Sequence, residues 1–283
     1  MASIVVVGSI NLDIVANASR LPTPGAKVTN AMLMQCPGGS GANQALAARR
    51  LGAKVALMGC VGRDAAADAA LALLREDGVD ISGVNAVPDA ATGVALIAVA
   101  TSGENQIVVA PGANLRRASE RFQLPAGDAF IGETLAPGDA VARAVTSFEG
   151  FKCVTLGTGT EIDESVLRDS NLIVVNESEA AWYSDRLASR EGLVAKTFGA
   201  SGAALFRNGV EVARSQSPVV KAIDTTGAGD AFTAALTLAL VEGQSHAKAL
   251  RFACAAGAAA AQRSGAQPSL PTRDEVEGLL HHA

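Results

Sequence analysis

The stretch ANQALAARRLGAKVALMGCVG, residues 42–62, changes midway from one hydrophobic pattern to another. Residues 42–53 are rich in Ala, Leu and Arg and indicate a helix, whereas residues 54–62 form a short apolar run typical of a buried strand. A similar apolar run, residues 3–9, precedes this stretch, and a helical pattern over about residues 64–77 follows it. Alternating strands and helices predict a parallel sheet covered by helices.

The same alternation resumes beyond Asn114. Further strands are predicted near residues 153–156, 172–175, 193–197 and 203–207. The C-terminal part predicts helices over residues 231–241, 245–263 and 273–280. The pattern therefore indicates an α/β protein with a doubly wound, mainly parallel sheet.

A second, smaller sheet is indicated by runs that do not alternate with helices. Residues 94–100 and 106–110 flank the turn TSGEN and predict a β-hairpin. Residues 28–34 have a similar strand-like composition. Because these runs come from separate parts of the chain, we expect them to form a small antiparallel sheet apart from the main one.

The composition is that of a globular protein without a surface for nucleic acid. Of the 283 residues, 49% are hydrophobic and 18% are charged, and the formal net charge is −5. No block of Lys or Arg supplies the basic patch that nucleic-acid binding requires. No apolar segment reaches the length of a membrane span, and MASIVVVGSIN lacks the features of a signal peptide. We therefore expect a soluble, cytoplasmic protein with no nucleic-acid or membrane partner.

Histidine and cysteine chemistry has few residues to use. The chain has only three histidines, and two of them, His281 and His282, lie near its C-terminus. Reduced, buried thiols are expected, rather than disulfides or a zinc site, because the cysteines form no CxxC pair and have no nearby histidine. The four cysteines are Cys36, Cys60, Cys153 and Cys254.

The segment DTTGAGDAFTAALTLALVEG, residues 224–243, places glycines and a carboxylate at the start of a predicted helix. The backbone amides of Gly227, Ala228 and Gly229 would be unpaired there, and such amides form an anion site. Asp230 would suit a base that takes a proton from a hydroxyl attacking a phosphoryl group. A plain helix start accounts for the same residues.

A second Gly-rich loop, PGGSGANQALAARRLGA (residues 37–53), also runs into a helix. It matches neither the dinucleotide fingerprint GxGxxG nor the phosphate loop GxxxxGK[ST], and neither pattern occurs elsewhere in the chain. A dehydrogenase is therefore a poor fit. By itself this loop indicates a tight turn with Asn43 as a polar group at the helix start.

Together the two loops resemble the signatures of the PfkB, or ribokinase-like, carbohydrate kinase family: GGSGANQALAARRLG the N-terminal one and DTTGAGDAFTAAL the C-terminal one. The resemblance continues in order through VVGSINLD, APGAN, VVNESEA, TFGASGAALF and RSGAQPSLP. It implies one domain over residues 1–283, with a β-sheet lid formed from about residues 12–36 and 92–112. It also implies phosphorylation of a primary hydroxyl on a small sugar, ribose or a related pentose or hexose, using ATP and Mg²⁺.

The resemblance implies roles for particular residues. Asp230 would be the general base, and the amides of Gly227, Ala228 and Gly229 would form the anion hole for the transferring phosphoryl group. The sugar would be bound by Asn11, Asp13, Gly39, Ser40, Gly41 and Asn43, with Glu133 as a further, displaced candidate. ATP would be bound by Asn176, Thr197, Gly199, Gly202 and Cys254.

Two metal sites are implied as well. Glu179, in NESE, belongs to a segment that the family associates with Mg²⁺ and phosphate, although a solvated helix carboxylate accounts for it equally well. A K⁺ ion would hold the TTGAG loop in shape without touching the substrate. Its ligands would come from the side chains of Asp224, Thr226 and Ser269 and from the backbone of Ala260, Arg263 and Gly265.

Two departures from the family pattern concern the substrate. Ser40 stands where close ribokinases carry Lys, and residues 155–158, TLGT, replace an Asn-Pro-Ala-Pro-like stretch. A nucleoside kinase of the same fold and a non-catalytic sugar-binding protein on this scaffold are therefore alternatives. The single Trp and single Tyr favour a sugar over a nucleoside, because they offer little surface for stacking a base. The lid edge would allow a homodimer.

Overall fold

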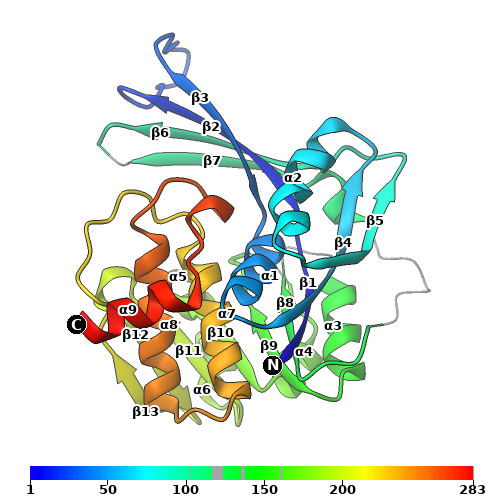
Figure 1. The fold of residues 1–283 in the computed structure, drawn as a ribbon, viewed down its shortest axis with the longest axis vertical. Helices are drawn as coiled ribbons and strands as arrows, with labels where there is room; N and C mark the ends of the chain where they lie inside the picture. The colour runs from blue at the N-terminus through cyan, green and yellow to red at the C-terminus, as the bar shows by residue number, and fades with distance from the viewer. Residues whose placement is uncertain (103, 117–123, 135–137, 160, 283) are drawn as a thin grey trace.

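The main sheet holds nine strands and runs through the centre of the molecule (Figure 1). The structure is a computed structural model that describes residues 1–102, 104–116, 124–134, 138–159 and 161–282. The strand order is β13-β12-β11-β10-β9-β8-β1-β4-β5, and all neighbouring pairs are parallel except β11–β12 and β12–β13. The strands are β1 (Ser3–Val7), β4 (Lys54–Gly62), β5 (Asp80–Val87), β8 (Ala129–Glu133), β9 (Phe151–Thr155), β10 (Leu172–Asn176), β11 (Leu193–Thr197), β12 (Ala203–Arg207) and β13 (Val210–Ser215).

Helices cover both faces of the main sheet because its central strands are apolar on both sides. In β1, Ile4 and Val6 join one hydrophobic core, and Val5 and Val7 join the other. The first core is covered by α1 (Ser40–Arg50), α2 (Ala65–Glu76), α7 (Ala228–Val241), α8 (His246–Ala260) and α9 (Arg273–His282). The second is covered by α3 (Gly138–Ser147), α4 (Glu164–Asp169), α5 (Glu177–Trp182) and α6 (Ser184–Ala188). The predicted doubly wound α/β fold class is confirmed.

The lid is a separate sheet of four strands with the order β3-β2-β6-β7. Because β2 starts shortly after the carboxyl end of β1, the lid stands over that edge of the main sheet, beyond α1 and α7 (Figure 1). The lid is mixed and not purely antiparallel as predicted, because β2 and β6 leave the main sheet in the same direction and pair in parallel. Its strands are β2 (Asn11–Ala18), β3 (Met32–Gly38), β6 (Gly93–Ala100) and β7 (Asn105–Ala110).

The first half of the lid corrects the sequence prediction. A strand was expected over residues 28–34, but residues 28–31 lie in no strand and β3 continues to Gly38. Pro37 and Gly38 resemble turn signals, yet β3 is an edge strand, where a proline is tolerated because its missing amide faces no partner strand. Asn11 and Asp13 lie in the first half of β2.

Three strands of the main sheet were not predicted. β5 and β13 lie at its two edges, where exposed polar residues weaken the hydrophobic pattern. β8 is fully buried, but its five residues contain Gly132 and Glu133 and do not form a purely apolar run. The C-terminal helices and the β6–β7 hairpin are confirmed close to their predicted bounds.

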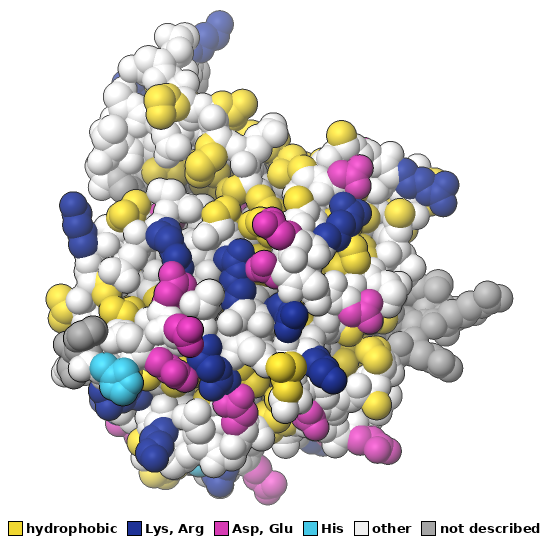
Figure 2. Space-filling view, in the orientation of Figure 1, with side chains coloured by type: hydrophobic (Ala, Val, Ile, Leu, Met, Phe, Trp, Pro, Cys, Tyr) yellow, Lys and Arg dark blue, Asp and Glu magenta, His cyan; other side chains and the backbone are white. Residues whose placement is uncertain are grey.

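The surface of the main body carries both signs of charge. Figure 2 shows Lys and Arg side chains interspersed with Asp and Glu below the lid, while hydrophobic side chains gather on and just beneath the lid. None of the helices in the described ranges is both long and apolar enough to cross a membrane. All four cysteines are buried and free of disulfides, as predicted.

Candidate active site

Two helices begin at the edge of the main sheet that the lid covers. α1 begins at Ser40 after Gly39, and α7 begins at Ala228 after Gly227, and neither glycine can cap its helix with a side chain. Gly227 has a φ of 79°, a left-handed conformation that glycine adopts without strain. Because both helix starts line one cavity, their positive dipole ends act on the same space.

At least four cavities adjoin in this region, and one of them, about 350 Å³, is lined by lid residues together with Asp224, Thr226 and Gly265. The lid cavity, about 650 Å³, lies beneath the lid and includes Asn11, Asp13, Asn43 and Ile97 in its walls. The junction cavity, about 270 Å³, includes Gln44, Glu133, Asn176 and Glu179. The α8 cavity, about 320 Å³, includes Val219, Phe232, Cys254 and Gly257. Ser40 and Asp230 line both the lid and junction cavities, and Thr197 and Gly229 line both the junction and α8 cavities, so these three cavities form a row.

Asp230 lies in the wall shared by the lid and junction cavities. Two amides of α1 donate to its carboxylate: Asn43 Nδ2 to Oδ2 at 2.8 Å and Gln44 Nε2 to Oδ1 at 3.1 Å. The residue keeps some contact with solvent through the cavities, but protein surrounds it, and this burial raises its pKa to about 7. The two amides oppose the rise, while the charges of Glu133 and Asp13 add to it. Asp230 can therefore exchange a proton near neutral pH.

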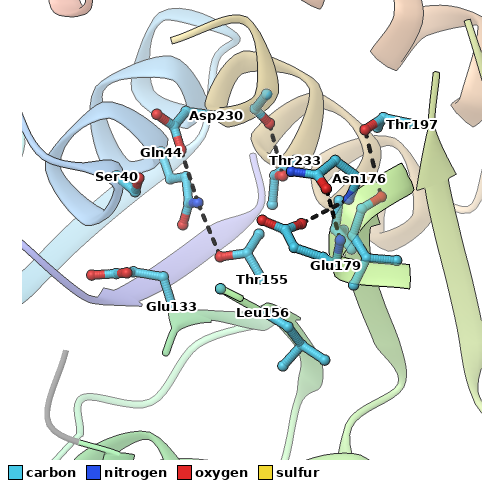
Figure 3. A pocket seen from close by; sticks show the side chains of 14 residues that line it. Ser40, Gln44, Glu133, Thr155, Leu156, Asn176, Glu179, Thr197, Asp230 and Thr233 are labelled. Carbon is cyan, nitrogen blue, oxygen red and sulfur yellow. Dashed lines mark hydrogen bonds between the residues drawn. The ribbon is translucent and has the colours of Figure 1, made fainter. Parts of the chain in front are cut away.

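Gln44 is a site residue that the sequence reasoning missed. It is 1% exposed and lies on α1 directly after Asn43, between Asp230 and Thr155 (Figure 3). A polar residue next to Asn43 in a helix otherwise rich in Ala and Leu is the signal that could have found it.

The glycine loop before α7 offers fewer unpaired amides than expected. The Ala228 N–H donates to the Thr225 carbonyl at 3.1 Å, because the left-handed Gly227 closes a turn there. The amides of Gly227 and Gly229 have no hydrogen-bond partner among the described residues. Of the three amides expected to form the anion site, two are therefore unpaired in the structure.

Asn11 and Asp13 project from β2 into the lid cavity and are buried. Burial raises the pKa of Asp13 to about 6. Asn114, in the segment APGAN, fixes the orientation of the Asn11 side chain, because Asn114 Nδ2 donates to Asn11 Oδ1 at 2.8 Å. Asn114 Oδ1 also accepts a hydrogen bond from the Ile10 N–H, and its Nδ2 donates to the Ile10 carbonyl. These bonds hold the Asn114 side chain in place, and it in turn fixes the side chain of Asn11.

The loop before α1 divides its roles. Gly39, Ser40 and Asn43 line the lid cavity. Gly41, expected beside them, does not line it but packs against β1, since a Cβ there would lie 2.5 Å from the Cα of Gly8. Gly41 therefore allows α1 to approach the end of β1 closely, and its contact with a sugar stays a prediction.

Glu133 lies at the end of β8, 2% exposed, and lines the junction cavity instead of the lid cavity. Its Oε1 accepts a hydrogen bond from the Ser9 N–H at 2.6 Å. Thr155 and Gly157, of the segment that departs from the family pattern, line the same cavity. The structure thus brings this segment to the site, next to Ser40.

Asn176 and Glu179 form a capping box at the start of α5. Asn176 Oδ1 accepts from the Glu179 N–H at 2.9 Å, and Glu179 Oε2 accepts from the Asn176 N–H at 2.7 Å. Both side chains line the junction cavity, and burial raises the pKa of Glu179. The capping box leaves one carboxylate oxygen of Glu179 available to the cavity.

The α8 cavity brings together four residues predicted to bind ATP: Thr197, Gly199, Gly202 and Cys254. Its remaining walls are apolar or small, including Val219 and Gly257. A Cβ on Gly257 would lie 3.2 Å from the Ala228 carbonyl, so glycine keeps α8 close to the start of α7. The walls of this cavity are largely apolar, which suits a flat aromatic ring.

Asp224 joins the loop before α7 to the loop after α8. Its Oδ1 accepts from the Thr226 N–H and hydroxyl, and its Oδ2 accepts from the Gly265 N–H at 2.9 Å. Burial raises the pKa of Asp224, but these hydrogen bonds outweigh it and the net pKa is lowered. Around this link, Arg263 donates to the Ser269 carbonyl, and the Ser269 hydroxyl donates to the Ala266 carbonyl. The Ala260 carbonyl accepts from the Arg263 N–H at 3.3 Å.

The charges of the site are arranged for a neutral molecule on one side and an anion on the other. The acidic side chains that line the lid and junction cavities are those of Asp13, Glu133, Glu161, Glu179 and Asp230. Among the described residues, no Lys or Arg lines the lid, junction or α8 cavity. Positive potential comes instead from the starts of α1 and α7.

Sequence comparison places relatives over the whole chain. The family model described as pfkB family carbohydrate kinase matches residues 1–273. A ribokinase from Haemophilus influenzae is 34% identical over 310 residues, covering 99% of each chain. A ribokinase from Bacillus subtilis is 34% identical over 294 residues, covering 99% of this chain and 100% of its own.

Structural comparison agrees. A crystal structure of ribokinase from Thermotoga maritima matches with a TM-score of 0.89 and 29% identity, covering 99% of this chain and 100% of that one. The structure of Arabidopsis thaliana ribokinase complexed with ribose and ATP matches with a TM-score of 0.83 and 29% identity, covering 99% and 98% of the two chains.

Proposed function

The chain belongs to the pfkB family of carbohydrate kinases, and we propose that it transfers the γ-phosphoryl group of ATP to a primary hydroxyl of an uncharged sugar, with ribose as the first candidate. The observation that carries this proposal is the position of Asp230, in the wall between the lid cavity and the junction cavity. The ribokinases above are similar over the full length of the chain, and the Arabidopsis one was solved with ribose and ATP.

In this proposal the lid cavity receives the sugar. Asp13 accepts hydrogen bonds from adjacent hydroxyls, and Asn11 and Asn43 add amide groups beside it. An uncharged acceptor is favoured over a sugar phosphate, because no basic side chain among the described residues lines the cavity and acidic ones do. A sugar is favoured over a nucleoside, since no described residue lining the lid cavity is aromatic.

Asp230 acts as the general base. It takes the proton of the primary hydroxyl as that oxygen forms a bond to the γ-phosphorus, and the bond from phosphorus to the bridging oxygen of ADP breaks. The amides of Gly227 and Gly229 at the start of α7 donate to the phosphoryl oxygens. Asn43, bonded to Asp230, orients both the base and the sugar.

The α8 cavity suits the adenine ring, and the junction cavity suits the phosphates. Glu179 and Asn176 present hard oxygen and amide groups there, and Mg²⁺ is typically held by one or two carboxylates together with substrate phosphates. The residues present therefore fit this ion. When bound, Mg²⁺ neutralises charge on the phosphates.

A monovalent cation is proposed at the link between the loops before α7 and after α8. Asp224 and Thr226 offer a carboxylate and a hydroxyl, and the N–H of Gly265 ties the opposite loop to Asp224. These oxygen donors fit K⁺. The ion would stabilise the loop that presents Gly227 without contacting the sugar.

A homodimer through the lid is also proposed. β7 is an edge strand of the lid, and Ile107, Val108 and Val109 are all more than half exposed, at 54%, 64% and 51%. An exposed apolar edge strand is a natural surface for pairing with a second copy.

The central test is a substrate panel. The purified chain is incubated with ATP, Mg²⁺ and K⁺ and with ribose, other pentoses and hexoses, adenosine, inosine or pseudouridine, and phosphorylated products are identified by ³¹P NMR. We expect ribose or a related sugar to be phosphorylated, and the rate to fall when Mg²⁺ is chelated or K⁺ is replaced by choline. Asp230→Asn should lower kcat by about 10²–10⁴-fold.

Each alternative has its own outcome in this panel. Products from nucleosides alone would replace the sugar proposal with a nucleoside kinase. Sugar binding without any product would favour a non-catalytic binding protein. Equal turnover by wild type and Asp230→Asn would remove Asp230 from the role of base.

A further inference from the structure

Gln44 holds the carboxylate of Asp230 from the side opposite Asn43. Asn43 lines the lid cavity, and Asp230 lines both the lid cavity and the junction cavity. Gln44 lines the junction cavity, where it lies beside Asp230 (Figure 3). Each amide donates to a different oxygen, Asn43 to Oδ2 and Gln44 to Oδ1. The two oxygens of Asp230 are therefore distinguished by their surroundings.

The orientation of the Gln44 amide follows from chemistry. A carboxylate only accepts hydrogen bonds, so Nε2 must face Asp230, and it also lies 3.4 Å from Thr155 Oγ1. Oε1 must then point the other way, where it is buried without a hydrogen-bond partner among the described residues. An unpaired buried acceptor is costly, so Oε1 is expected to receive a donor that arrives with the substrates, a water or a hydroxyl.

The charges that face Asp230 come from other elements. The charges of Asp13 on β2 and Glu133 on β8 raise its pKa, and the acidic side chains of Glu161 and Glu179 line the same two cavities. No Lys or Arg in the described ranges lines either cavity. Apart from the positive end of the α7 dipole, only the two side-chain amides therefore favour the charged form of this carboxylate. Losing one of the two amides should therefore raise the pKa of Asp230 further.

We propose that Gln44 is a positioning residue for phosphoryl transfer: it holds Oδ1 of Asp230 on the junction side, so that Oδ2 meets the sugar hydroxyl on the lid side. The inference depends on the proposed function, because it assigns a partner to the proposed base. It differs from the role of Asn43, which lines the sugar side and would contact the sugar itself.

Two substitutions of Gln44 separate this role from a general structural one. Gln44→Met keeps the length of the side chain and removes the hydrogen-bond donor. The apparent pKa below which kcat/KM falls should therefore rise by about one pH unit. Gln44→Lys supplies a charged donor, so the same apparent pKa should fall. In Gln44→Met we also expect kcat to fall about tenfold or more, with the KM for sugar changed less than about threefold. Gln244→Met, at a half-buried position in the connection between α7 and α8, is the matched control and should behave as wild type.

A second readout does not need turnover. In protein labelled with ¹³C at the aspartate carboxyl groups, the Asp230 signal is assigned by its loss in Asp230→Asn, and its titration midpoint is compared among wild type, Gln44→Met and Gln44→Lys. Opposite shifts in the two variants support the proposal, and thermal unfolding confirms that both are folded. Shifts in the same direction, or an unchanged midpoint, overturn it. If wild type phosphorylates no sugar, the proposed function fails, while this titration still decides whether Gln44 controls Asp230.

Discussion

At the scale of single residues, the ionisation of Asp230 should set the pH range of activity. A general base must be ionised, and burial raises the pKa of Asp230 to about 7. We therefore expect kcat/KM for the sugar to rise with pH through about 7, level off above it, and fall about tenfold per unit well below it. Below about pH 6 the fall should steepen, because Asp13 also becomes protonated. Initial rates from pH 5 to 9 check this, and a flat profile from pH 5.5 to 8 would contradict it.

At the scale of elements, the packing of β3 against β2 controls the sugar site. A Cβ on Gly38 of β3 would lie 2.1 Å from Asp13 Oδ2, so Gly38→Ala must displace that carboxylate. Hydrogen bonds to a charged group contribute about 1.5–3 kcal/mol each, so we expect the KM for sugar to rise about tenfold or more. ATP affinity, measured by calorimetry, should stay unchanged. Gly278→Ala on α9, where a Cβ meets nothing within 4 Å, is the control. An unaltered KM in Gly38→Ala would argue against Asp13 as a sugar ligand.

At the scale of the whole molecule, the exposed apolar edge of the lid predicts a dimer. One charged substitution on that edge should prevent the two copies from associating. Ile107 and Val109 line the lid cavity, so Val108 between them faces the opposite side of β7. We expect the wild type to sediment as a dimer and Val108→Lys as a monomer, because an unpaired ammonium is costly to bury. Val210→Lys, on the edge strand β13 and 65% exposed against 64% for Val108, should remain dimeric. A wild type that is monomeric at all concentrations would rule the lid dimer out.

Much of the fold follows from local pattern alone. The alternation of apolar runs with helical segments is enough to predict the doubly wound sheet, and the turn TSGEN predicts the β6–β7 hairpin. Edge strands escaped prediction, since half of their side chains face solvent and lose the apolar pattern. The strand that became β3 was predicted too close to the N-terminus, because Pro37 and Gly38 break a strand in the interior of a sheet but not at its edge.

The sequence by itself determined the family signatures and the residues placed at the two helix starts, because glycines and Asp230 are adjacent in the chain. Only the tertiary structure decided which residues meet Asp230. Gln44 is 186 positions away from it, and Glu133 reaches the junction cavity instead of the lid cavity. The pKa of Asp230 also depends on burial, on hydrogen bonds from two amides of α1 and on charges from β2 and β8. Burial and long-range contacts arise only when distant segments pack, so no local pattern encodes them.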